Sequence, residues 1–154
     1  MKSKTSLVQT PQNFPFSEAV TCRKIEIEGE SATIEPNMET VFEEKIIKAW
    51  EAVDDFPHYE ELYDLKVEFD DEVEEIINEK ELRPTVQGDK LFGFPFWVQS
   101  IEYPNDRKTG TRMELIFQLD SEDNLPYMFG DVGVGHLSKS KKNDEEMAFG
   151  WACH

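Results

Sequence analysis

The last third of the chain holds four short blocks in which aromatic residues and glycines recur at strand-like spacing. The blocks are LFGFPFWVQ (91–99), ELIFQLDS (114–121), MFGDVGVGH (128–136) and FGWACH (149–154). Side chains alternate between two faces along a strand, and apolar residues alternate in this way from Met113 to Leu119. The blocks therefore predict an antiparallel sheet formed mainly by residues 94–153, with strands at 96–101, 113–119, 132–137 and 147–153.

Helical periodicity appears upstream of these blocks, in the acidic middle of the chain. Thr40 and Glu43 fit a capping box, and apolar residues follow at three- and four-residue intervals, namely Phe42, Ile46, Ala49, Trp50 and Val53. This pattern predicts a helix over residues 40–54. A second helix is predicted over residues 71–82, where the acidic first turn suits the helix dipole. Alternating apolar and polar residues predict short strands at 23–28, 31–35 and 65–69.

The length and these patterns together predict one α+β domain. A chain of 154 residues has the size of a single ordinary domain. Residues 1–20 are polar and contain two prolines, so they are expected to form a loose arm. Residues 21–154 then form the domain, with two acidic helices packed on or beside the sheet and the four blocks inside residues 85–154.

The charge of the chain disfavours some partners and suggests others. The net charge is −17, and the stretch from Glu39 to Leu82 has 17 acidic and four basic residues, a net charge of −13. Nucleic-acid binding depends on lysine and arginine, so no nucleic acid is expected as a partner, and anionic membranes are disfavoured for the same reason. The acidic stretch is either a solvated face that keeps the protein soluble or a docking surface for a basic protein.

The sequence pattern favours a cytoplasmic location. The N-terminal segment MKSKTSLVQTPQ is basic but has no apolar run behind it, and no apolar stretch approaches the ~20 residues that span a bilayer. The two cysteines, Cys22 and Cys153, lie far apart and lack CxxC spacing, so no disulfide framework is expected.

The four blocks, in this order, resemble the C-terminal half of the YwqG-like family. LFGFPFWVQ is similar to a Gly-Gly-Tyr-Pro-type strand start, LIFQLDS to a Leu-Phe-Gln-Leu-Asp-Ser strand, GDVGVGH to a glycine-rich hairpin and WACH to a closing Trp-x-Cys-His. The resemblance is good over residues 85–154 and loose over residues 20–84. Phe92 stands in place of the first glycine of the Gly-Gly pair, and the first of the two β-rich units of typical members is reduced or absent.

The resemblance implies protein binding rather than a reaction. The family has no established activity, and it is distantly similar to the programmed cell death protein 2 group, whose members are dedicated chaperones for a ribosomal protein. Bacterial members occur near polymorphic-toxin systems, which implies an immunity role. A reduced first unit would leave a sheet edge uncovered, and because edge strands tend to pair, a homodimer is a further hypothesis.

The glycines and several polar residues of the blocks are interpreted as structural. Gly130, Gly133 and Gly135 follow the order G-x-x-G-x-G, but no helix follows to bind a phosphate. Glycines in a strand commonly mark a bulge or a close backbone approach. Asp120 and Ser121 are expected to cap a turn, and Pro95 belongs to the motif that starts the strand at residue 96.

No metal, cofactor or catalytic residue is predicted. A metal site would need at least three of four side chains to converge, these being Asp131, His136, Cys153 and His154. Adjacent residues point to opposite faces of an extended chain, which separates Cys153 from His154. A Cys–His nucleophile would need Cys153 in contact with His136 and an activated thiolate. Paired carboxylates, such as Asp120 and Asp131, are the alternative acid and base.

The aromatic residues of the blocks predict a binding cleft. Rings of this kind anchor partners, and a few polar side chains orient a ligand. The residues predicted to line the cleft are Phe94, Trp97, Gln99, Gln118, Asp131, His136 and Trp151. The favoured function is a non-catalytic protein-binding module, and the alternative is a small-molecule binder or hydrolase-type enzyme that uses the same cleft.

Overall fold

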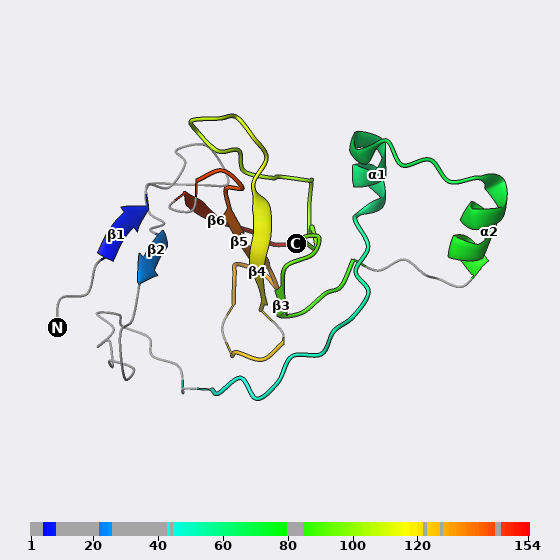
Figure 1. Ribbon diagram of the computed structural model, residues 1–154. Coiled ribbons are helices and arrows are strands. Elements are labelled where there is room, and N and C mark those ends of the chain that lie inside the picture. Colours follow the sequence, from blue (N-terminus) through cyan, green and yellow to red (C-terminus); the bar gives the residue numbers. More distant parts are fainter. Residues whose placement is uncertain are drawn as a thin grey trace.

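A four-stranded antiparallel sheet is the centre of the fold (Figure 1). The computed structural model describes residues 5–8, 22–25, 43, 45–79, 85–121, 123–126, 128–143 and 146–154. The sheet has the order β3-β4-β5-β6, with β3 at Lys90–Leu91, β4 at Glu114–Asp120, β5 at Val134–Lys139 and β6 at Met147–Ala152. Three of the four predicted strands therefore correspond to β4, β5 and β6.

The remaining elements lie to either side of this sheet (Figure 1). Strands β1 (Thr5–Val8) and β2 (Cys22–Ile25) form an antiparallel pair, and β2 contacts β6. Helices α1 (Tyr59–Leu65) and α2 (Asp71–Glu79) both lie on the other side. The fold is α+β, as predicted. Strand β1 falls within the segment expected to form a loose arm, and the predicted strand at 31–35 lies outside the described residues.

The strand register gives the sheet two different faces. Lys90, Gln118, His136 and Gly150 are paired across all four strands. The neighbouring row consists of Leu91, Phe117, Leu137 and Phe149. Successive residues of a strand point to opposite sides, so these two rows mark opposite faces. We call the face with Gln118 and His136 the inner face, and the face with Phe117 and Phe149 the outer face.

A β-bulge in β4 changes the predicted alternation. The register shifts between Leu115 and Phe117, and Leu115 is paired with Ser138, which lies on the inner face two residues from His136. Ile116 is therefore the extra residue, and a bulge of this kind re-aims the side chains that follow it. As a result Leu115 shares the inner face with Gln118, while Phe117 and Leu119 point to the outer face. The alternation predicted from Met113 to Leu119 would place Leu115, Phe117 and Leu119 on one face, and in this respect the prediction is wrong.

The interior of the described region is unusually polar. Its buried apolar residues are Met113, Leu115, Val134, Met147 and Ala148. Its buried polar residues are Glu61, Thr85, Lys90, Asp106, Gln118, Ser121, His136, Ser138, Ser140 and Glu146. Buried polar groups need hydrogen-bond partners, and here most partners are backbone groups of the loops. Side-chain hydrogen bonds to loops therefore hold much of this fold together.

The predicted strand at 96–101 is absent, because this segment bonds to side chains instead of to a neighbouring strand. Residues 94–104 contain no strand. Pro95 has no N–H for a ladder, and the backbone N–H groups of Phe94 and Phe96 donate to side chains of Asp55 and Gln118. We call residues 94–104 the crossing loop.

The predicted helix at 40–54 is wrong over its described part, since residues 45–54 have no regular secondary structure. Ile46, Ile47, Trp50 and Val53 are exposed, so no described surface buries the apolar stripe, and a short helix without packing is marginal in water. Trp50 instead meets Phe117 edge-to-face, with ring centroids 6.4 Å apart.

Helix α2 begins at Asp71, the first residue of the second predicted helix, and ends at Glu79. Its start is capped by Asp70, whose Oδ1 accepts a hydrogen bond from the N–H of Val73 at 2.9 Å. The predicted strand at 65–69 is wrong. Leu65 ends α1, and Lys66 takes a left-handed conformation (φ 54°) that caps the helix.

Candidate functional site

The backbone of Phe96 is held on the inner face by two paired side chains. The N–H of Phe96 donates to Oε1 of Gln118 at 2.8 Å, and its C=O lies 3.0 Å from Nε2 of His136. Gln118 and His136 are cross-strand partners on β4 and β5. The crossing loop is therefore fixed to the sheet through both backbone groups of one residue, and this contact is the centre of the candidate site.

Gln118 is buried and bonded to backbone groups of two loops. Its side chain is fully buried, and its Nε2 donates to the C=O of Gly88 at 2.9 Å and to that of Val86 at 3.4 Å. The amide thus joins the loop before β3 to the crossing loop. An unpaired buried donor or acceptor costs ~1–3 kcal/mol, which explains why a polar residue occupies this apolar strand.

His136 is a neutral hydrogen-bond donor at neutral pH. A carbonyl oxygen can only accept, so Nε2 carries the proton that bonds to Phe96, and Nδ1 is left with its lone pair. Burial lowers the pKa of His136 to about 4 because the desolvated imidazolium is disfavoured, while the bond to the Phe96 carbonyl acts in the opposite direction. The ring also lies 4.9 Å from that of Trp97, measured between centroids.

This pKa predicts a loss of stability in mild acid. The pKa of histidine in the unfolded chain is about 6.5, so as the pH falls from there toward 4 the unfolded state binds the proton and the folded state does not. The free energy of unfolding should therefore fall by up to about 3 kcal/mol over that window.

The substitution His136→Gln keeps an N–H donor for Phe96 but does not titrate. Denaturant unfolding at neutral pH and at a pH just above 4 should show a smaller drop for this variant than for the wild type. Equal drops in the two proteins would show that His136 is not the group responsible, because the carboxylates are common to both.

Glu61 joins helix α1 to the crossing loop. This carboxylate is fully buried; it accepts hydrogen bonds from Nε1–H of Trp97 at 2.9 Å and from the hydroxyl of Tyr103 at 2.8 Å. Arg112 approaches it at 3.8 Å and stacks over the Tyr103 ring at 4.0 Å. Burial and the bond to Glu61 raise the pKa of Tyr103, so its proton stays on the phenol.

A second buried ion pair anchors the start of the crossing loop. Asp55 accepts from the N–H groups of Val86 and Phe94, both at 2.8 Å, and forms a 3.0 Å salt bridge with Lys90. Lys90 also donates to the C=O of Phe94. Burial lowers the pKa of Lys90, and the bond to Asp55 opposes this shift. These charges hold backbone in place and are largely shielded from solvent.

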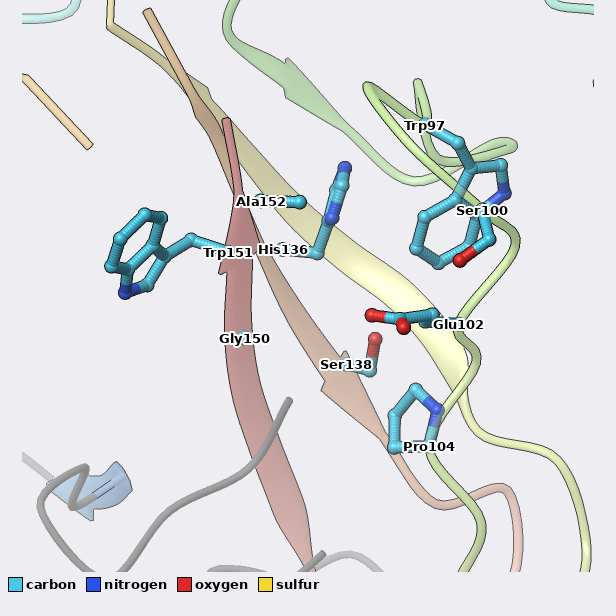
Figure 2. A pocket seen from close by; sticks show the side chains of 9 residues that line it. All are labelled: Trp97, Ser100, Glu102, Pro104, His136, Ser138, Gly150, Trp151 and Ala152. Carbon is cyan, nitrogen blue, oxygen red and sulfur yellow. The ribbon is translucent and has the colours of Figure 1, made fainter. Parts of the chain in front are cut away.

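A small hollow opens between the crossing loop and strands β5 and β6 (Figure 2). It encloses about 340 Å³ including its open mouth, but has room for only about one water molecule at its centre. The side chains of Trp97, Glu102, His136 and Ser138 point into it, while the indole of Trp151 points away across β6 (Figure 2). The space exists because Gly150, opposite His136, has no side chain.

The predicted cleft residues are divided between the two faces. Trp97, Gln118 and His136 lie together on the inner face, with Phe94 nearby in the crossing loop. Trp151 lies on the outer face, where it stacks on Phe129 with centroids 6.1 Å apart. The structure therefore does not bring all seven residues into one cleft.

Two other predicted cleft residues form hydrogen bonds with the last two residues of the chain. Gln99 donates to the C=O of Cys153 at 2.6 Å. Asp131 is exposed, and its C=O accepts from the N–H of His154 at 3.2 Å. Neither residue lines the hollow beside His136.

The glycine-rich segment is tightly packed. A Cβ at Gly133 would lie 2.3 Å from the C=O oxygen of Phe129 and 2.5 Å from that of Ala152. At Gly135 it would meet the rings of Phe129 and Phe149 at 2.7 and 2.8 Å. Gly130 has φ +61°, a conformation that favours glycine. These positions leave no room for a ligand.

Ser121 and Asp120 both bond to neighbouring loops. The hydroxyl of Ser121 donates to the C=O of Gly133 at 2.6 Å and accepts from the N–H of Phe129 at 2.8 Å. The Asp120 carboxylate accepts from the N–H of Gly88 at 3.2 Å. Pro95 is fully buried within the crossing loop.

Comparison with known protein families matches residues 3–152 to "Domain of unknown function (DUF1963)". The match covers nearly the whole chain. The chain belongs to the DUF1963 family. No curated protein and no solved structure matches it. The site described above is therefore interpreted from its own geometry.

Two further findings concern metal ions and membrane-spanning helices in this DUF1963 domain. Within the described ranges, no three His, Cys, Asp or Glu side chains converge in a way that could bind a metal ion. Neither α1 nor α2, the helices of the described region, has the length and apolar character needed to cross a bilayer.

Sequence patterns missed several important residues of the DUF1963 site. Asp55 and Glu61 sit in the acidic stretch, where a carboxylate is expected to face water, and no local pattern marks them as buried. Lys90 and Tyr103 were missed for a similar reason, because long-range contacts alone give them their roles. By contrast, Gln118 inside an apolar strand was a visible signal.

Proposed function

We propose that this DUF1963 domain is a non-catalytic protein-binding module of the cytoplasm, related to the YwqG-like family and with an immunity- or chaperone-like role. The main support is the way its central polar residues are used. Gln118, His136 and Glu61 hold the crossing loop in place. Asp55 and Lys90 neutralise each other. Groups engaged in this way do not form an acid, base or nucleophile aimed at a substrate.

The surface of helices α1 and α2 suits a basic protein partner. Half of its exposed side chains are acidic, with a few aromatic and aliphatic ones among the rest, and no basic residue occupies the last turn of either helix. The exposed residues of the two helices and their capping residues, which we call the helix surface, are Tyr59, Glu60, Tyr63, Leu65, Lys66, Asp70, Asp71, Glu72, Val73, Glu74, Glu75 and Ile76. Tyrosine is a favoured anchor at interfaces, and a predominantly negative charge speeds association with a basic partner.

Charge reversal on α2 should abolish partner capture. In pull-downs from the native host, we expect the wild type to retain a basic protein at low salt and to release it at high salt, because screening weakens exposed charges. Glu72→Lys, Glu74→Lys and Glu75→Lys in one variant should remove that protein from the eluate, as identified by mass spectrometry.

The matched control changes the same amount of charge elsewhere. Glu43→Lys, Glu51→Lys and Asp131→Lys alter exposed residues outside both helices and should leave capture intact. Loss of the partner in both triple variants would contradict the proposal that the partner binds to the surface of α1 and α2. Capture that does not depend on salt would contradict it as well.

The hollow beside His136 supports a second candidate function, the binding of a small molecule. A thermal-shift screen tests it, since a ligand at 100 times its Kd stabilises the folded state by about 2.7 kcal/mol. A homodimer through an open sheet edge is a third proposal, and light scattering that shows only monomers would remove it.

A further inference from the structure

Within the part of the chain that the structure describes, two buried polar atoms of the hollow lack a hydrogen-bond partner. Ser138 is 2% exposed and His136 is 7% exposed. Neither the hydroxyl of Ser138 nor Nδ1 of His136 has a hydrogen-bond partner among the described residues, whereas Nε2 of His136 is bonded to Phe96. Buried polar atoms are almost always satisfied by protein, water or ligand. These two lie two residues apart on β5 and face the same space (Figure 2).

A half-buried carboxylate completes the set. Glu102 of the crossing loop is half-buried and lines the same hollow as Ser138 (Figure 2). No Lys, Arg or His of the described ranges forms a salt bridge with Glu102, and Arg112 is paired with Glu61. A partly desolvated carboxylate is stabilised when a cation lies beside it. The hollow therefore favours a positively charged occupant.

We propose that the hollow binds a primary ammonium group. Such a group has three N–H donors, and the hollow offers three acceptors in Nδ1 of His136, Oγ of Ser138 and the carboxylate of Glu102. The room at the centre fits a group the size of one water molecule. The indole of Trp97 forms one wall, and a cation is attracted to the face of such a ring.

The ammonium group has two sources, a free amine and the tip of a lysine side chain. The lysine would belong to a basic partner, so in that form the inference rests on the proposed function. The binding of a free amine does not depend on any partner. A titration with a free amine therefore tests the hollow separately, and its failure can be told apart from failure of partner capture.

Methylammonium chloride is the probe, added at constant ionic strength and followed by amide and indole N–H resonances in NMR. We expect saturable shifts for the indole N–H of Trp97 and the amides of β5 near His136 and Ser138. The indole of Trp151, which points to the other side of β6 (Figure 2), should stay unchanged and serves as an internal control.

Two variants test the proposed acceptors, and two further ligands test which kind of cation binds. Glu102→Gln should weaken methylammonium binding by at least about ten-fold, since bonds to charged groups are the stronger ones, and Ser138→Ala should weaken it less. Tetramethylammonium has no N–H donor and should not bind. Binding of Nα-acetyl-lysine amide would assign the site to a lysine side chain, and binding of methylammonium alone would assign it to a free amine.

Three results would overturn the proposal. The first is the absence of a saturable shift at Trp97, which would mean that the hollow holds water only. The second is an equal response to tetramethylammonium. The third is undiminished binding by Glu102→Gln, whose folding is verified in the same spectra.

Discussion

Replacing Gly133 with alanine should strongly destabilise the domain. The added Cβ would lie 2.3 and 2.5 Å from two carbonyl oxygens, those of Phe129 and Ala152. Backbone cannot easily move away here, because Gly133 itself donates to the C=O of Phe129 at 2.9 Å and accepts from Ser121. Overpacking of this kind costs about 1–3 kcal/mol in ordinary cores and more when backbone is the obstacle, so we expect a loss above about 3 kcal/mol.

Gly110→Ala provides the matched control. Gly110 has φ +65°, and a Cβ there meets no atom within 4 Å. The stability lost in Gly110→Ala should therefore come only from holding alanine in the left-handed conformation, which costs about 1–2 kcal/mol. Urea unfolding followed by circular dichroism measures both variants. If Gly133→Ala is no less stable than Gly110→Ala, the close backbone contacts do not limit this position.

Replacing Glu61 with alanine should cost about 3–5 kcal/mol, the usual loss when one partner of a buried charged network is removed. The indole N–H of Trp97 and the hydroxyl of Tyr103 would both lose their acceptor in a buried site. Loss of the carboxylate would cost less at Arg112, because its side chain is 42% exposed and water can solvate the charge. Denaturant unfolding gives the free energy, and the emission of Trp97 should shift to the red as water reaches the indole.

Helix α1 offers its own control for this experiment. Glu60 is exposed on the same helix, and surface substitutions usually change stability by no more than about 0.5 kcal/mol, so Glu60→Ala should be nearly silent. Glu61→Gln should fall between the two, since one carboxylate oxygen becomes an N–H₂ group that faces a donor. Equal midpoints for the Glu61→Ala variant and the wild type would contradict the assigned role of Glu61.

Local sequence patterns predicted three of the four strands of the sheet, because apolar residues recur along each of the three at strand-like spacing. Residues 113–119, 132–137 and 147–153 overlap β4, β5 and β6. The bulge at Ile116 could not be predicted, since it depends on how β4 pairs with β5. The same is true of residues 96–101, which alternate like a strand but bond to side chains from elsewhere in the chain.

Sequence patterns predicted a site residue only where its type is unusual for the segment around it. Gln118 is conspicuous inside an apolar strand, and His136 follows a glycine-rich segment. Glu61 and Asp55 look like surface carboxylates in a stretch of net charge −13, and only long-range contacts bury them. Trp151 was expected beside Trp97, but the strand register sends its side chain to the outer face.

The way Phe96 is fixed has a consequence for how this domain reaches its native state. Its N–H and C=O can bond together only when Gln118 and His136 sit opposite each other on β4 and β5. A slip of one residue between these strands would turn Gln118 away from the inner face. Misaligned sheets would leave the crossing loop without these two bonds, so docking of this loop stabilises the native strand alignment over one shifted by a single residue.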